Sequence, residues 1–457
     1  MNPAYRNCKG ENKTTARRRD HSAFRAIATS AIAGLALVAT TAGTSFAAPR
    51  PVSAKQDVTI NVALAYPPPP KATLAAFTKS TGIRVNYSYI QWDSLQTKIA
   101  AAAEAHTYFA DVTDVDWSKV GEYYETKWFL PLNKYFNLAS VRANYPQVDS
   151  FIRNGKLIGM PADISLMVTD VNVKDFAKAG ITKMPTTFSQ YVADLKTLQA
   201  KGVAAHPLDI PFAAAEGLST YWYELTAAFG GRVLSPSYKP EFTSPSSPGY
   251  KAMAWMVAAY KEGLVPKANL GLIDYQGFTQ DMATNKTASV FSDYSGDIGT
   301  IYDVPSSSKV VGQVQYIPTP GLSGPAPNLA NPDGIGIPVE AKNVKAAVEF
   351  IKWFDEPANQ ADFAGAHGGA KAVEGFPLPA NKQGLALLVA SHKVPGAAAL
   401  ASLAEHHSRA VFPGGAPPWY PAFSHAVYTN LHSAAAGQES VASAIKAIAA
   451  QVASLGG

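Results

Sequence analysis

The chain has 457 residues, of which 47% are apolar and 16% are charged. This composition can build a hydrophobic core, so it excludes a disordered chain, and at about 150 residues per domain the length suggests two or three domains. The formal charge of +5 comes from the N-terminus: residues 1–47 hold seven basic and two acidic side chains, and the rest holds 32 of each. Without a net field to attract a polyanion, nucleic acid is not an expected partner.

The first 47 residues have the pattern of a cleavable export signal. The basic region ends at Arg25, a mildly apolar stretch covers 26–42, and small residues at Ser45 and Ala47 predict cleavage after Ala47. The alternative, a retained membrane anchor, needs a longer and more apolar run. Arg17–Arg19 suggests twin-arginine export without excluding the general secretory route. We expect a periplasmic or extracellular product.

The only cysteine, Cys8, lies in this signal, so the mature chain can form no disulfide and no Cys-ligated metal site. His406 and His407 are adjacent on a predicted helix, where neighbouring side chains point about 100° apart and seldom share a metal. We expect neither a metal nor a cofactor.

The mature chain opens with alternating strand and helix patterns. Alternating apolar residues predict strands, and apolar residues three or four apart predict helices: strand 58–64, helix 71–79, strand 83–89, a helix capped by Asp93 or Ser94, and strand 111–115. This order is typical of a parallel sheet flanked by helices. Ligands bind at the carboxyl ends of such strands, here 65–67, 91–93 and 114–117.

Beyond Pro161 the pattern starts again, which indicates a second α/β unit. Strands are expected near 166–168, 288–291 and 310–316, a long loop at 318–338, and helices at 173–179, 188–198, 220–229, 251–262, 277–283, 344–355, 383–391, 397–407, 422–436 and 440–453. The predicted fold class is α/β with two units.

Several segments, in order, resemble one family. These are Phe-Thr-Lys-Ser-Thr-Gly-Ile-Arg-Val at 77–85, Asn-Gly-Lys-Leu-Ile-Gly-Met-Pro at 154–161, Ala-Gly-Ile with Pro-Thr-Thr-Phe at 179–188, Phe-Gly-Gly at 229–231 with Lys-Glu-Gly-Leu-Val at 261–265, and Ala-Gly-Gln-Glu-Ser-Val at 436–441. They resemble the extracellular solute-binding proteins of ATP-driven (ABC) importers, in the carbohydrate-binding branch that includes maltose-binding protein. Phe188 stands where that family usually has Trp.

The resemblance implies a two-lobe periplasmic-binding-protein fold of type II, with the ligand held between the lobes. Its crossings transfer to 162–165, 317–318 and 365–369, so lobe one would comprise 57–163 plus 318–365, and lobe two 166–316 plus 370–457. It also implies a monomer that is not an enzyme and that delivers a sugar or sugar alcohol to a membrane permease.

The candidate ligand contacts are aromatic and acidic side chains, most of them at strand ends. Carboxylates accept hydrogen bonds from sugar hydroxyls, and aromatic rings cover the apolar faces of sugars. Family comparison ranks the Asp293-Tyr294 loop highest and also places Tyr66 and Asp163 near the ligand. The full expected set is Tyr66, Trp92, Asp93, Asp116, Trp117, Asp163, Tyr221, Trp222, Asp293, Tyr294, Asp297, Trp419 and Tyr420.

Other interpretations stay open from sequence. Asp93 could only cap a helix, Trp117 could be core, and the Asp293-Tyr294 pair could cap a helix near Gly296. A secreted carbohydrate-active hydrolase would need a carboxylate pair at a set separation, which the sequence does not define. A polyamine would favour aspartates without aromatics, and a phosphate ester would favour several arginines; neither pattern is found.

Overall fold

The computed structural model describes residues 58–456 with gaps at 274–277, 295, 372–375 and 413. The expected export signal therefore lies outside the described residues. Within them, no helix combines the length and apolarity needed to cross a bilayer.

The first sheet is built from five strands in the order β2-β1-β3-β12-β6. Their bounds are β1 (Val58–Leu64), β2 (Ile83–Tyr89), β3 (Val112–Asp116), β6 (Met160–Pro161) and β12 (Asp333–Gly336). Strands β1, β2 and β3 run parallel, as the sequence predicted, and β12 is antiparallel to β3 and β6. On β1 the alternating residues Ile60, Val62 and Leu64 are buried, which is why this segment forms a strand against a core.

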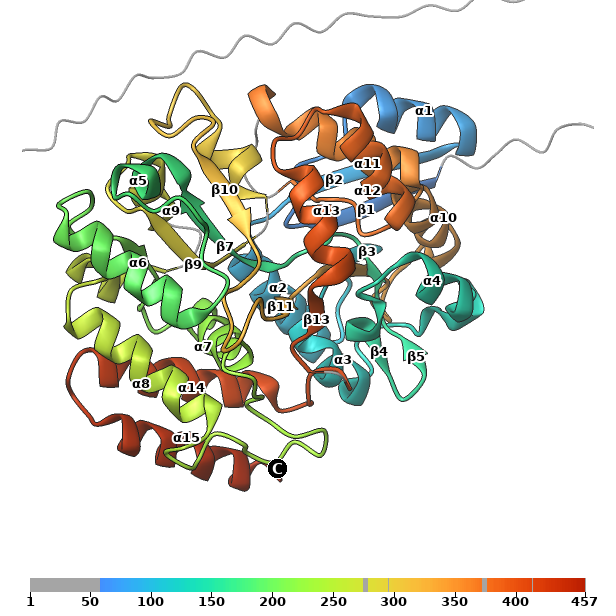
Figure 1. Ribbon diagram of the computed structural model, residues 1–457. Helices are drawn as coiled ribbons and strands as arrows, with labels where there is room; N and C mark the ends of the chain where they lie inside the picture. The colour runs from blue at the N-terminus through green and yellow to red at the C-terminus, as the bar shows by residue number, and fades with distance from the viewer. Residues whose placement is uncertain (1–57, 274–277, 295, 372–375, 413, 457) are drawn as a thin grey trace, which may run out of the picture. The chain divides into compact units, whose positions relative to one another are not determined.

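Helices cover this sheet and complete the first hydrophobic core. They are α1 (Lys71–Thr81), α2 (Trp92–Glu104), α3 (Val120–Thr126), α4 (Leu138–Asn144), α10 (Val344–Phe354) and α11 (Pro357–His367). Helix α1 ends at Gly82, whose φ of 76° only glycine adopts without strain. In Figure 1 the late helices α10 and α11 lie beside the early strands β1 and β2, so the chain returns to its first sheet.

The second sheet has four strands in the order β10-β7-β9-β8. They are β7 (Met167–Asn172), β8 (Leu208–Asp209), β9 (Ser289–Tyr294) and β10 (Val314–Ile317), and β9 is parallel only to β8. Around them lie α5 (Val173–Lys178), α6 (Phe188–Ala200), α7 (Glu216–Ala228), α8 (Pro248–Lys261), α9 (Phe278–Ala283), α12 (Lys382–Ser391), α13 (Ala397–His406), α14 (Tyr420–Ala435) and α15 (Val441–Ser454). Figure 1 shows α14 and α15 running beside α8. These elements share the second hydrophobic core.

The chain passes between the two cores in three neighbouring segments. Ala162 belongs to the first core and Leu166 to the second; Ala330 belongs to the second and Ile335 to the first. The third segment contains Leu378, whose carbonyl accepts a hydrogen bond from the Ile164 amide at 3.0 Å. The second passage follows β11 (Asn328–Ala330), which pairs with β13 (Ser408–Ala410). The lobe bounds that the family resemblance implies stay predictions.

Most expected elements are present, and the misses are short or poorly patterned. Helices α3 and α4 were not predicted, because seven residues span about two turns and give little periodicity. Strand β10 begins at Val314 rather than Val310. Helix α2 begins at Trp92 with Gln91 as its N-cap, so neither Asp93 nor Ser94 caps it.

Candidate ligand-binding site

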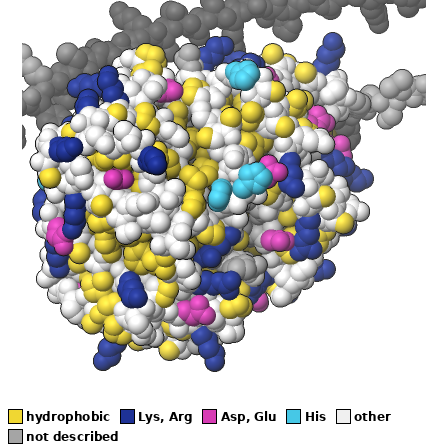
Figure 2. Space-filling view, viewed as in Figure 1, with side chains coloured by type: hydrophobic (Ala, Val, Ile, Leu, Met, Phe, Trp, Pro, Cys, Tyr) yellow, Lys and Arg dark blue, Asp and Glu magenta, His cyan; other side chains and the backbone are white. Residues whose placement is uncertain are grey.

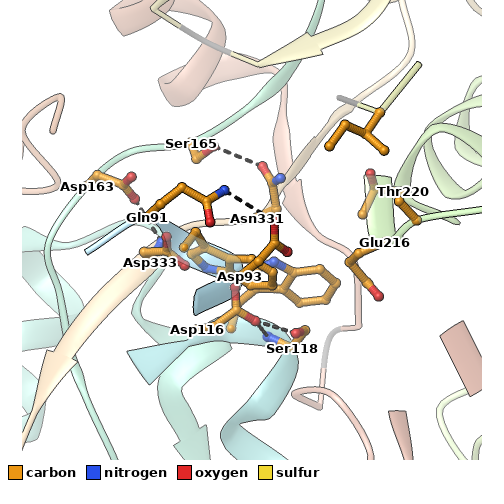
Figure 3. Close-up of a pocket in the computed structure, with 14 residues that line it drawn as sticks. Gln91, Asp93, Asp116, Ser118, Asp163, Ser165, Glu216, Thr220, Asn331 and Asp333 are labelled. Atoms are coloured by element: carbon orange, nitrogen blue, oxygen red, sulfur yellow. Dashed lines mark hydrogen bonds between the residues drawn. The ribbon is translucent and has the colours of Figure 1, made fainter. Parts of the chain in front are cut away.

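A cavity lies where the carboxyl ends of the first sheet, the passage segments and the start of α7 meet (Figure 3). We call it the cleft. Its lining is mostly polar, with two indoles: Gln91, Trp92, Asp93, Asp116, Trp117, Ser118, Asp163, Ser165, Ala215, Glu216, Thr220, Ile273, Asn331 and Asp333.

The start of α2 holds an aromatic and an acidic side chain at the cleft. The Gln91 side chain accepts a hydrogen bond from the Ser94 amide at 3.5 Å and donates one to Asp93 Oδ2 at 3.2 Å. This cap places Trp92 and Asp93 in the first helical turn. Trp92 is half-buried, so part of its ring is available to a ligand.

The end of β3 contributes the next pair. Asp116 is 4% exposed, and its Oδ1 accepts hydrogen bonds from the Ser118 amide at 2.7 Å and from the Ser118 hydroxyl. Trp117 lines the cleft but is itself only 6% exposed, because its ring packs edge-on against Tyr420 with centroids 5.3 Å apart. Trp117 therefore forms a wall whose position depends on α14.

The passage segments supply a hydrogen-bonded polar group. The Asp333 amide donates to Asp163 Oδ1 at 2.8 Å, and the Ser165 hydroxyl donates to Asn331 Oδ1 at 3.0 Å, as Figure 3 shows. The Ala162 amide also donates to the Asp333 carbonyl at 2.9 Å. Side chains of the segments that join the two cores thus face the cleft directly.

Helix α7 closes the other side of the cleft, where Glu216 and Thr220 face the acidic groups in Figure 3. The Tyr420 hydroxyl donates to Glu216 Oε1 at 2.5 Å. Burial raises the pKa of Glu216, and the hydrogen bonds from Tyr420 and Ser424 oppose that rise.

Burial perturbs the carboxyl groups behind and within the cleft. It raises the pKa of Asp163 to about 7, although contacts with the Asp333 backbone and Tyr66 oppose the shift. The pKa values of Asp114 and Asp333 are also raised, by burial first and by neighbouring carboxylates second. Gln96 Nε2 donates to Asp114 Oδ2 at 2.6 Å. With a pKa of about 7, the Asp163 carboxyl can either accept or donate hydrogen bonds near neutral pH, which suits hydroxyl ligands.

Five of the predicted contacts line the cleft. They come from α2, the end of β3 and the first passage: Trp92, Asp93, Asp116, Trp117 and Asp163. Tyr66 does not line it; it is 4% exposed and lies in the first core near Asp163, and burial raises the pKa of its hydroxyl.

The structure places Tyr221 and Trp222 in the second core instead of the cleft. Both are 0% exposed. Trp222 Nε1 donates to the Gly249 carbonyl at 2.8 Å, and its ring packs against Phe242 at 5.1 Å. Every residue of α7 after Glu216 is buried, so only its first turns reach the cleft. Tyr221 and Trp222, near the start of α7, therefore pack in the second core.

In the loop ranked highest from sequence, the described side chains of Asp293 and Asp297 are not among those that line the cleft. Asp293 is 0% exposed in β9, opposite Val168 in the register, and accepts a hydrogen bond from the Tyr302 hydroxyl at 2.7 Å. Asp297 is half-buried just before the helical turn 298–302. The Tyr294 side chain lies outside the described residues.

The C-terminal aromatic pair supports the cleft from behind. Tyr420 is 1% exposed and holds both Glu216 and Trp117. Trp419 packs edge-on against Tyr238 at 5.9 Å and does not line the cleft. Tyr420 therefore supports the wall of the cleft, and a contact of either aromatic residue with a ligand stays a prediction.

Several lining residues were missed by the sequence analysis. The main ones are Gln91, Glu216, Thr220, Asn331 and Asp333. Asn331 and Asp333 lie in what the sequence presented as a proline- and glycine-rich loop, where asparagine and aspartate are ordinary turn residues. Only the pairing of β12 with β3 brings them to the strand ends.

Comparison with known proteins matches residues 65–361 to the family model described as bacterial extracellular solute-binding protein. The chain belongs to this family. The resemblance seen in the sequence is therefore confirmed, and members of this family are extracellular binding proteins. No curated protein matches the chain.

Several solved structures of solute-binding proteins have the same fold as this chain. A ribitol complex from Agrobacterium radiobacter has a TM-score of 0.72 at 21% identity, covering 87% of this chain and 98% of its own. Maltose-bound MalE3 of T. maritima has 0.70 at 20%, covering 87% and 100%. A D-mannitol complex from Agrobacterium vitis has 0.69 at 18%, covering 87% and 97%. These likenesses confirm the predicted two-lobe α/β fold.

Proposed function

We propose that this solute-binding protein captures a sugar or sugar alcohol in the cleft and delivers it to the membrane permease of an ABC importer. The observation that carries the proposal is the pairing of indoles with carboxylates in one cavity. Trp92 offers an apolar face for stacking, and Asp93, Asp116 and Asp163 offer hydrogen-bond acceptors. Relatives with the same fold are described with bound ribitol, maltose and D-mannitol, which supports this ligand class.

The ligand should bring the two cores closer together. The lining comes from the first sheet, from the passage segments and from α7 of the second core, so a ligand touching all three has more contacts when they close. A ligand can drive closure only if it binds the closed form more tightly. Small-angle scattering should therefore show a smaller radius of gyration with ligand, and an unchanged value with proven binding would contradict closure.

The test of the ligand class is a thermal-shift screen of the exported protein against monosaccharides, disaccharides, oligosaccharides and polyols. A ligand at about one hundred times its dissociation constant should stabilise the protein by about 2.7 kcal/mol. Trp92→Ala should reduce the shift at the same ligand concentration, and Tyr89→Ala, which removes a 55% exposed ring outside the cleft, should keep it. No shift with any sugar or polyol would refute the proposed class.

A positively charged ligand is the second candidate, and the charge of the lining favours it. Five carboxyl groups and no lysine or arginine are among the cleft residues. The positive charge of an amino sugar or a polyamine would pair with these carboxylates, whereas the raised pKa of Asp163, about 7, lowers their negative charge near neutral pH. Calorimetry with glucosamine, spermidine and their neutral counterparts separates the two candidates.

We further propose that the chain is exported with cleavage after Ala47, acts as a monomer and carries no catalytic activity. A bound oligosaccharide should stay intact over hours of incubation, whereas a carbohydrate-active hydrolase would shorten it.

A further inference from the structure

A second cavity lies apart from the cleft, between residues of the first core and the β11–β13 ribbon. It has a volume of about 240 Å³, far above the 10 to 15 Å³ that one water needs by the same measure. Its lining shares no residue with the cleft: Pro146, Gln147, Asp149, Ser150, Arg232, Ala330, Ser408, Arg409, Ala410 and Val411.

Gln147 is the unusual residue of this cavity. It is 8% exposed, yet neither its Nε2 nor its Oε1 has a hydrogen-bond partner among the described residues. Leaving a buried polar group unpaired costs about 1 to 3 kcal/mol. An amide buried in this way against a cavity is satisfied by a molecule that both accepts a hydrogen bond from Nε2 and donates one to Oε1.

The charge around the cavity is positive. Arg232 and Arg409 both line it, and the presence of Arg232 is one cause that lowers the pKa of Arg409, after burial. Arg409 is held in place because its Nη2 donates to the Gly231 carbonyl at 3.0 Å.

Two carboxylates, Asp149 and Glu224, lie near the arginines of this cavity, and both accept hydrogen bonds from other groups. Asp149 lines the cavity, but its Oδ1 accepts from Arg142 Nε at 3.0 Å on the exposed side. Glu224 attracts Arg409 from outside the lining, and its two oxygens accept from the Thr319 hydroxyl and the Leu329 amide. Among the described residues no salt bridge joins either guanidinium group to a carboxylate, although Glu224 attracts Arg409 from outside the cavity lining.

We propose that this cavity is a binding site for a small oxyanion that also carries a hydroxyl group, of which hydrogen phosphate is the simplest. The two guanidinium groups supply charge-assisted donors to the anionic oxygens. The Gln147 amide donates to a third oxygen and accepts from the hydroxyl, so its unpaired atoms are both satisfied. Sulfate at neutral pH has no hydroxyl and leaves Oε1 unpaired, so the site should discriminate against it.

The test is calorimetric titration of the full exported protein with inorganic phosphate and with sulfate, near pH 7 at constant ionic strength in a non-phosphate buffer. Wild type should bind phosphate at least tenfold more tightly than sulfate. Arg232→Gln, at an exposed position, should weaken phosphate binding by about tenfold or more. Gln147→Leu should bring the phosphate and sulfate affinities within about twofold of each other, a change in preference that a merely structural role of Gln147 would not cause.

Arg84→Gln is the matched control, because it removes an exposed guanidinium on β2, outside the cavity. It should leave phosphate binding within twofold of wild type. Circular dichroism checks that each variant is folded. If Gln147→Leu does not fold, Arg232→Gln still tests the proposal. The proposal is overturned if wild type does not bind phosphate, if the arginine variant binds it as wild type does, or if phosphate and sulfate bind equally.

Discussion

The buried carboxyl group of Glu224 allows a test of how burial changes a pKa and, through it, the stability of the protein. Glu224 lies on α7, the helix that carries Glu216 and Thr220 into the cleft, and it is 0% exposed. Its oxygens accept from the Thr319 hydroxyl at 2.6 Å and from the Leu329 amide on β11 at 2.8 Å. Burial raises its pKa from 4.5 to about 7, although these hydrogen bonds oppose the rise.

The direction of the pH effect follows from that shift. Between the two pKa values the native state binds the proton and the unfolded state does not, so the native state loses stability as pH rises. With values of 4.5 and about 7, linkage gives a loss of about 2 to 3 kcal/mol in the free energy of unfolding between pH 5 and pH 8.

Glu224→Gln should remove this pH-dependent contribution while keeping the size of the side chain. The difference in unfolding free energy between wild type and variant, measured by urea denaturation at several pH values, should shift by about 2 to 3 kcal/mol in favour of the variant from pH 5 to pH 8. Glu349→Gln, whose side chain is 54% exposed, is the matched control and should follow wild type. Parallel curves for wild type and Glu224→Gln would refute the reasoning.

Four further predictions concern ligand, hinge, core and export. Trp92→Ala should weaken binding of a cognate sugar by about ten- to a hundredfold in calorimetry, because it removes the stacking face, and an effect below twofold, like that expected of Tyr89→Ala, would contradict this. Wild-type affinity should rise from pH 6 to pH 8 as Asp163 ionises and becomes a charge-assisted acceptor, and Asp163→Asn should flatten that profile; identical profiles would exclude the role. Trp222→Phe should lower the melting temperature, since it loses the hydrogen bond to a buried carbonyl, and leave sugar affinity within twofold; a large loss of affinity would return Trp222 to the site. Mass spectrometry of the exported protein should find an N-terminus at or near Ala48, and retention of the preceding basic region would contradict export by cleavage.

The local patterns of the sequence predicted much of the fold. Alternating residues in 58–64 and 83–89 produced parallel strands β1 and β2, because a period of two buries one face of each strand. The rule that ligands bind at the carboxyl ends of parallel strands then located Trp92, Asp93, Asp116 and Trp117 at the cleft.

Tertiary structure alone decided the other side of the cleft. Asp333 and Asn331 reach it because β12 inserts between β3 and β6. The pairing of β12 with β3 spans more than 200 positions, which no local pattern encodes. Tyr221, Trp222 and Asp293 have the same residue types as the side chains that line the cleft, but all three are fully buried outside it. Aromatic and acidic side chains serve equally well in packing, in hydrogen-bonded interiors and in ligand sites. Which of these roles each one takes depends on the direction of its side chain after the lobes have assembled, and that direction is a property of long-range packing.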